Sequence, residues 1–150
     1  MAGAKVSKAP PPNAQAVKDR WLVTLSSLVD QVETWAKAAG WATRRIEKSM
    51  RDREIGDYRA PAVMMQDDFV RILLEPLGHS SARGSDGLAD IYRMPAYDDV
   101  ARLYHDDLGW HIFGVSPFPA TAARPGGEAD ALLTEPIFRD LLDRLKRDGD

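Results

Sequence analysis

The chain has no cysteine, which excludes disulfide bonds, thiolate catalysis, iron–sulfur clusters and cysteine-ligated zinc. It also lacks any hydrophobic run approaching the roughly 18 apolar residues that suggest a membrane-spanning helix. The first residues, "MAGAKVSKAPPPNAQ", do not contain the hydrophobic stretch of a secretion signal. We therefore expect a cytoplasmic protein without a membrane segment.

Neither sign of charge dominates the composition. The 20 basic and 23 acidic residues give a net charge of −3, so the chain as a whole has no attraction for nucleic acid or anionic membrane. A length of 150 residues fits one domain, and a hydrophobic fraction of 44% is ordinary for a globular protein. The abundance of Ala, Arg and Asp hints at a bacterial, GC-rich source.

Small residues and three consecutive prolines occupy the start of the chain. We interpret residues 1–13 as a flexible tail, because such a segment cannot bury enough apolar surface to offset its ordering entropy. Residues 14–150 are predicted to form a single domain. Stretches rich in Gly, Ser or Pro predict mobile loops within it at 78–87 and 116–131.

Helical periodicity is clear near both ends of the predicted domain. Asn13 is a candidate N-cap for a helix that runs to about Ala39, with Gly40 just past its end. Its apolar stripe recurs at three- and four-residue steps: Val17, Trp21, Leu25, Leu28, Val32, Trp35 and Ala39. A second helix is predicted after Thr134, with an apolar face of Ile137, Phe138, Leu141, Leu142 and Leu145.

Short apolar runs separated by turn residues predict an antiparallel sheet between these helices. Runs at 62–65 and 69–74 flank Gln66, Asp67 and Asp68, which is typical of a hairpin. Further strands are expected at 88–94 and in "VARLY", whereas "REIGDYRAP" reads as a connection. Residues 41–53 fit a charged strand, and a helical turn stays open as the alternative.

The predicted fold class is therefore α+β. A long N-terminal helix precedes an antiparallel meander of five or six strands, and a C-terminal helix packs with it on one sheet face. The connections between strands are too short for parallel crossovers. The other face of the sheet could be solvated or could bind a ligand.

The stretch "LYHDDLGWHIF" holds the densest collection of chemically active side chains. A three-residue loop with Gly109 in a left-handed position would pair His105 with His111 across a hairpin. Such a pair could hold a divalent metal, with Asp107 as the third ligand. We favour a polar cross-strand pair without metal, and we expect no cofactor.

Three aspartate pairs could in principle converge as metal ligands for phosphoryl chemistry: Asp67-Asp68, Asp98-Asp99 and Asp106-Asp107. In a meander, successive turns fall at opposite ends of the sheet, so we do not expect all three to meet. The sequence also contains no P-loop, no G-x-S-x-G elbow and no H-E-x-x-H motif.

Basic residues cluster between positions 41 and 59, where acidic residues interleave and reduce the local charge. A solvated, charged edge strand is the interpretation we favour. The second is a docking surface for an acidic protein partner, and the third is a site for nucleic acid. The docking surface would be formed by Trp41, Arg44, Arg45, Lys48, Tyr58 and Arg59.

The leading functional hypothesis is a non-enzymatic module that binds a protein partner, such as an accessory subunit, an immunity-type inhibitor or a chaperone-like adaptor. The first alternative is a small-molecule or metal-dependent site on the sheet face around His105 and His111, with Tyr92, Tyr104 and Glu75. Nucleic-acid binding through residues 41–59 is the second alternative. Formation of a homodimer also stays open.

Overall fold

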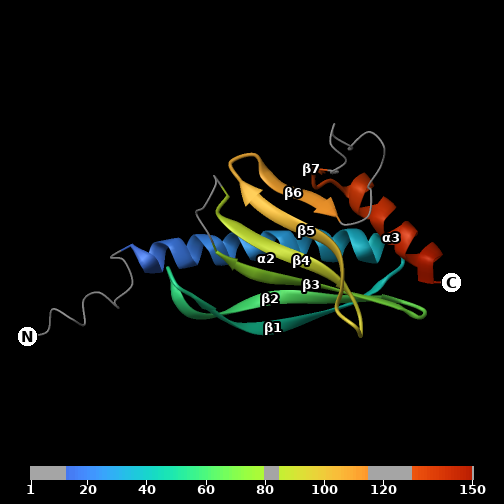
Figure 1. Cartoon of the computed structure of the whole chain (residues 1–150), viewed down its shortest axis with the longest axis horizontal. Coiled ribbons are helices and arrows are strands. Elements are labelled where there is room, and N and C mark those ends of the chain that lie inside the picture. The colour runs from blue at the N-terminus through green and yellow to red at the C-terminus, as the bar shows by residue number, and fades with distance from the viewer. Residues whose placement is uncertain (1–12, 80–84, 115–129, 150) are drawn as a thin grey trace, which may run out of the picture.

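The computed structural model describes residues 13–79, 85–114 and 130–149. The elements in chain order are α2 (Ala14–Ala38), β1 (Ala42–Asp52), β2 (Gly56–Asp67), β3 (Val70–His79), β4 (Gly87–Arg93), β5 (Asp98–Asp106), β6 (Gly109–Gly114), β7 (Asp130–Leu132) and α3 (Glu135–Gly149). The seven strands form one antiparallel meander in the order β1-β2-β3-β4-β5-β6-β7. Figure 1 shows α2 lying along the sheet, with α3 beside one end of α2.

The predicted α+β arrangement is confirmed, with seven strands in place of five or six. β2 begins at Gly56, so the stretch read as a connection is largely strand and pairs with β1. β7 overlaps the predicted loop at 116–131, because three residues are too few to show an alternating pattern. The rest of that loop, the tail up to residue 12 and residues 80–84 lie outside the described residues.

α2 follows the predicted stripe closely. Its buried residues recur at helical spacing: Ala14, Trp21, Leu25, Leu28, Val29, Val32 and Ala36. Gly40 ends the helix with φ +91°, a conformation that glycine adopts without steric cost. Asn13 precedes the first turn as predicted, but its side chain makes no capping hydrogen bond. Neither helix of the described chain combines the length and apolar character needed to cross a membrane.

The main core lies between the two helices and the sheet. α3 contributes four buried side chains: Phe138, Leu141, Leu142 and Leu145. The Phe138 ring lies 6.0 Å from the ring of Trp35, so the two helices contact each other as well as the sheet. Alternate residues of the strands complete this core, among them Ile72, Ile91 and Ile112.

β1 and β2 form a long ribbon, and the part of β2 before Val63 does not pair with β3. Val63–Asp67 of β2 pairs with Val70–Leu74 of β3. Pro61 precedes the paired segment of β2, and Pro76 follows that of β3. Because proline has no N–H to donate, a regular ladder would lose bonds there. Side chains of β1 bind β3 instead: Lys48 Nζ donates to the carbonyl of Pro76 at 3.1 Å, and an Asp52 carboxylate oxygen accepts the His79 N–H at 3.0 Å.

A second apolar cluster fills the space between the start of α2 and this ribbon. It consists of Trp21, Leu25, Met50, Ile55, Tyr58 and Ala60. Trp21 Nε1 donates to the Tyr58 hydroxyl at 3.0 Å, and that hydroxyl donates to Asp52. Burial and the Asp52 carboxylate raise the pKa of Tyr58, which therefore stays protonated and keeps donating.

Candidate functional site

The basic stretch at 41–59 forms one edge of the sheet, as expected for a charged edge strand. Trp41 and Tyr58 are 3% and 8% exposed, so neither ring is available to a partner at the surface. The basic side chains contact carboxylates of different elements. Arg45 pairs with α2, Lys48 with β3 and Arg59 with β1. Arg44 is exposed on β1. The structure thus does not bring these six residues together on one surface.

The β5–β6 hairpin has a register one residue away from the predicted one. Asp106 pairs with Gly109, so two residues form the loop instead of three. In this register Leu103 pairs with Ile112, and both side chains are fully buried. The predicted register was wrong because it would have turned Ile112 away from the core.

The predicted facing of His105 and His111 is wrong for the same reason. His105 pairs with Trp110 and His111 with Tyr104, and successive residues of a strand point to opposite faces. The two imidazoles therefore lie on opposite faces of the sheet and cannot share an ion, while Asp107 is exposed in the turn. In the described parts of the chain, no group of three or more His, Cys, Asp or Glu could hold a metal.

The sheet face opposite the helices carries an ion pair between a buried aspartate and a half-exposed arginine. Asp90, 3% exposed, accepts hydrogen bonds from Arg102 at 2.8 and 3.0 Å and from the Tyr92 hydroxyl at 3.1 Å. Burial and the Asp90 carboxylate raise the pKa of Tyr92 to about 12, and the bond to Asp90 raises the pKa of Arg102. Neither donor releases its proton near neutral pH, so neither is suited to acid–base catalysis in that range.

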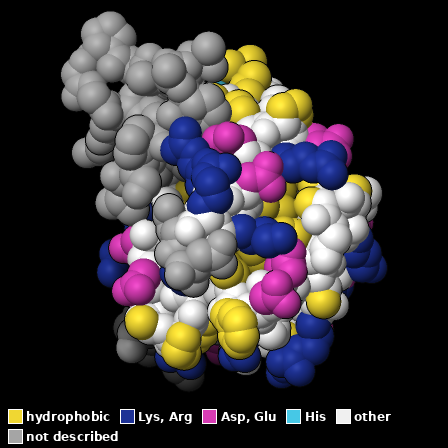
Figure 2. Space-filling view, turned by 90° about the vertical axis from the view of Figure 1, so that its right-hand side faces the viewer, with side chains coloured by type: hydrophobic (Ala, Val, Ile, Leu, Met, Phe, Trp, Pro, Cys, Tyr) yellow, Lys and Arg dark blue, Asp and Glu magenta, His cyan; other side chains and the backbone are white. Residues whose placement is uncertain are grey.

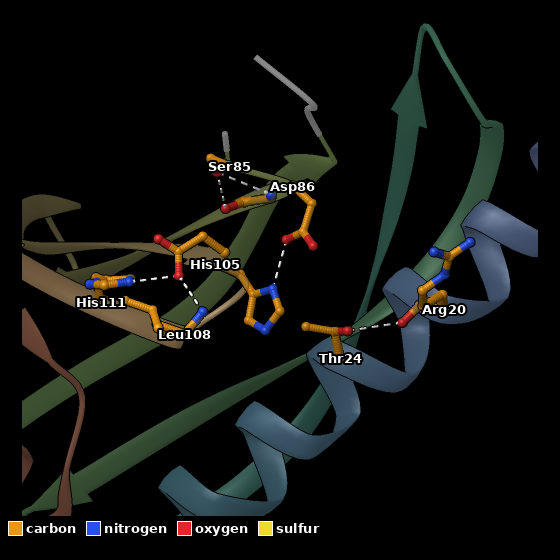
Figure 3. Close-up of polar contacts among 9 residues, drawn as sticks. Arg20, Thr24, Ser85, Asp86, His105, Leu108 and His111 are labelled. Atoms are coloured by element: carbon orange, nitrogen blue, oxygen red, sulfur yellow. Dashed lines mark hydrogen bonds and ion pairs between the residues drawn. The ribbon is translucent and has the colours of Figure 1, made fainter. Parts of the chain in front are cut away.

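All three histidines of the chain lie at the end of the sheet near the start of α2, which we call the histidine end. Each imidazole is next to a carboxylate: His79 Nδ1 is 3.6 Å from Glu54, His105 Nδ1 is 2.7 Å from Asp86, and His111 Nε2 is 2.8 Å from Asp106. Figure 3 shows the His105 and His111 contacts, which join neighbouring strands and turns. The bond from His111 lowers the pKa of Asp106, and the N–H of Leu108 acts in the same direction.

Trp21 of α2 packs against the sheet at the histidine end. Gly87 pairs with His79 on one side and with His105 on the other, so two imidazoles flank a position that has no side chain. The Trp21 ring occupies this position, and a Cβ on Gly87 would lie 2.1 Å from two of its carbons. The Trp21 ring is 5.9 Å from the His79 ring and 6.1 Å from the Trp110 ring.

A cavity of about 290 Å³ opens next to Trp21. The first turns of α2 form one wall, the β1–β2 turn forms a second, and the ends of β3 and β4 form the third. Its charged or titratable lining consists of Arg20, Glu54, His79 and Asp86.

The opposite end of the sheet, which we call the turn end, holds the β2–β3 and β4–β5 turns (Figure 1). Each turn presents an aromatic side chain to solvent: Phe69 is 98% exposed and Tyr97 is 54% exposed. Asp68 and Tyr97 have positive φ values of 51° and 60°, which non-glycine residues adopt rarely. Figure 2 faces this end and shows hydrophobic side chains interspersed with basic and acidic ones.

The sequence analysis missed Phe69, which we placed inside a strand that in fact begins at Val70. Its position directly after two aspartates of a turn was the available signal. The contact of Trp21 with Gly87 left no signal, because it joins residues far apart in the sequence.

Comparisons with known proteins find no matching family model, no similar curated protein and no similar solved structure.

Proposed function

We propose that the protein is a non-enzymatic interaction module that binds a partner protein at its turn end, with Phe69 and Tyr97 as anchors. The observation that carries this proposal is the nearly complete exposure of Phe69 at the tip of the β2–β3 turn. Burial of one phenylalanine side chain in a partner is worth about 1.5–3 kcal/mol. Aromatic anchors of this kind dominate the binding energy of many protein interfaces.

Contacts within the turn end hold the Tyr97 ring and the backbone of the turn that carries Phe69. The Tyr97 ring lies 5.5 Å from the ring of Tyr92. At the other turn, Lys146 of α3 contacts Asp67 at 2.7 Å, and the Gln66 side chain donates to the carbonyl of Asp68 at 3.2 Å. Anchors that are fixed before binding lose less conformational entropy when the partner docks. An accessory subunit, an inhibitor or an adaptor would each use such a surface.

Site-specific photo-crosslinking tests the proposal. A photoreactive phenylalanine analogue replaces Phe69 in one variant and Val23, which is 66% exposed on α2, in a control variant. In cells that make the protein naturally, we expect one dominant crosslinked protein from position 69 and none of it from position 23. The same product from both positions, or none from position 69, would contradict the proposal.

Competition separates specific docking from chance proximity. An excess of unlabelled wild-type chain should suppress the crosslink, whereas an excess of the F69S/Y97S double variant should not. Equal suppression by both chains would show that the two aromatic side chains are not the anchors. A crosslink to a second copy of this chain would replace the partner protein with a homodimer and overturn the proposal.

A further inference from the structure

His79 differs from the other two histidines in its contact with a carboxylate. Its Nδ1 is buried and has no hydrogen-bond partner among the described residues, although Glu54 Oε1 lies 3.6 Å away. That distance is too long for a hydrogen bond and short enough for an ion pair. The side chain is 11% exposed, so little water can compensate for the missing bond.

Charged groups from several elements lie around His79. Glu54 of the β1–β2 turn faces the ring, and Asp52 of β1 accepts the backbone N–H of His79 at 3.0 Å. Asp86, ahead of β4, and Arg20 of α2 line the same cavity. Asp86 is already paired with the His105 imidazole at 2.7 Å. In the described parts of the chain, Glu54 is therefore the carboxylate that directly faces His79 Nδ1.

Protonation of the His79 imidazole would strengthen the attraction between its Nδ1 and the Glu54 carboxylate. A neutral imidazole presents either a lone pair from Nδ1, which repels the carboxylate, or an uncharged N–H, which attracts it only weakly. An imidazolium presents an N–H instead, and a charge-assisted hydrogen bond to Glu54 forms after a small approach of the β1–β2 turn.

We propose that His79 and Glu54 form a pH-sensitive latch between the end of β3 and the β1–β2 turn. In acid the latch holds the turn, which carries Glu54 and Ile55, against the cavity. When the imidazole is neutral, the charge-assisted part of the attraction is absent and this wall of the cavity loosens. The latch lies at the opposite end of the sheet from the proposed docking anchors, so it does not depend on them.

A double-mutant cycle tests the latch directly. The equilibrium constants of urea unfolding are measured for wild type, H79Q, E54Q and the double variant at about pH 5.5 and about pH 8, on either side of the usual histidine range. We expect the two substitutions to be coupled by roughly three- to tenfold in acid and to be much closer to additive at the higher pH. Equal coupling at both pH values, or none in acid, would overturn the proposal.

The matched control cycle combines H79Q with E47Q. Glu47 lies on the same ribbon and contacts Arg59, so no coupling with His79 is expected at either pH. Coupling of the same size in this control would overturn the latch as well.

Hydrogen exchange provides a second readout if H79Q does not fold. Amides of the β1–β2 turn should exchange several-fold more slowly in acid than at the higher pH, after correction for the intrinsic pH dependence. The E54Q variant should lose this difference and E47Q should keep it. A difference that persists in E54Q would show that another group is responsible.

Discussion

Individual residues at the histidine end are constrained by a close contact between α2 and the sheet. Gly87 is required because the Trp21 ring occupies the volume in which any side chain at this position would lie. The Trp21 indole also donates to Tyr58, so the ring cannot move without the loss of a buried hydrogen bond. The two side chains therefore limit each other's substitution.

We predict that Gly87→Ala lowers the free energy of unfolding by about 3 kcal/mol or more, because overpacking at a rigid ring forces the helix outward. Denaturant unfolding measures the loss. In a Trp21→Leu background the added methyl has more room, so the further effect of Gly87→Ala should be much smaller. The same loss in both backgrounds would contradict the proposed contact.

At the ion pair on the opposite face, we predict that Arg102→Met destabilises the protein by about 2–3 kcal/mol, because it leaves the Asp90 carboxylate buried without its cation. The loss is smaller than the value of about 3–5 kcal/mol for a fully buried pair because the Arg102 side chain is 47% exposed. Adding Asp90→Asn should recover part of the stability in chemical denaturation. A double variant as unstable as Arg102→Met would argue against this explanation.

At the scale of elements, helices and strands differ in how far the sequence determines them. The stripes of both helices are local patterns, and the structure confirms them nearly residue by residue. The β5–β6 register depends on whether Ile112 or Phe113 enters the core, which is decided by α2 and α3 above the sheet. A local turn rule therefore gave the right hairpin in the wrong register.

The β5–β6 turn should open in acid. The folded pKa of Asp106 is lowered, so its contribution to stability is complete above the ordinary carboxyl pKa of about 4 and is lost as pH falls through the folded pKa. We expect the Leu108 amide, which donates to Asp106 at 2.9 Å, to lose protection in that window. Hydrogen exchange measures this loss, and Asp106→Ala should lack protection at every pH. Asp107→Ala is the control, and acid-independent protection in the wild type would contradict the prediction.

At the scale of the whole molecule, the sheet places two different surfaces at its two ends. The three histidines lie on the two faces of the histidine end, and two exposed aromatic side chains lie at turns of the opposite end. Lys146 of α3 contacts Asp67 at the turn end, and Phe138 of α3 is buried in the main core. The helix is thus an integral part of the fold.

We predict that Phe138→Ala destabilises the protein by about 3–5 kcal/mol, because it removes a fully buried ring that packs against Trp35. Thermal or chemical unfolding measures the effect. Asp143→Ala, at an exposed position of the same helix, should change the stability by less than about 0.5 kcal/mol. Similar effects from both substitutions would mean that α3 does not close the core.

The sequence by itself determined the two amphipathic helices, the antiparallel meander between them and the absence of cysteine chemistry. These properties follow from composition and from periodicities within a few residues. The tertiary structure decided which side chains meet: it separated His105 from His111, placed Trp21 on Gly87 and left Phe69 in solvent. The physical reason is that register and burial depend on contacts between segments far apart in the chain, where a shift of one residue reverses the face of every side chain.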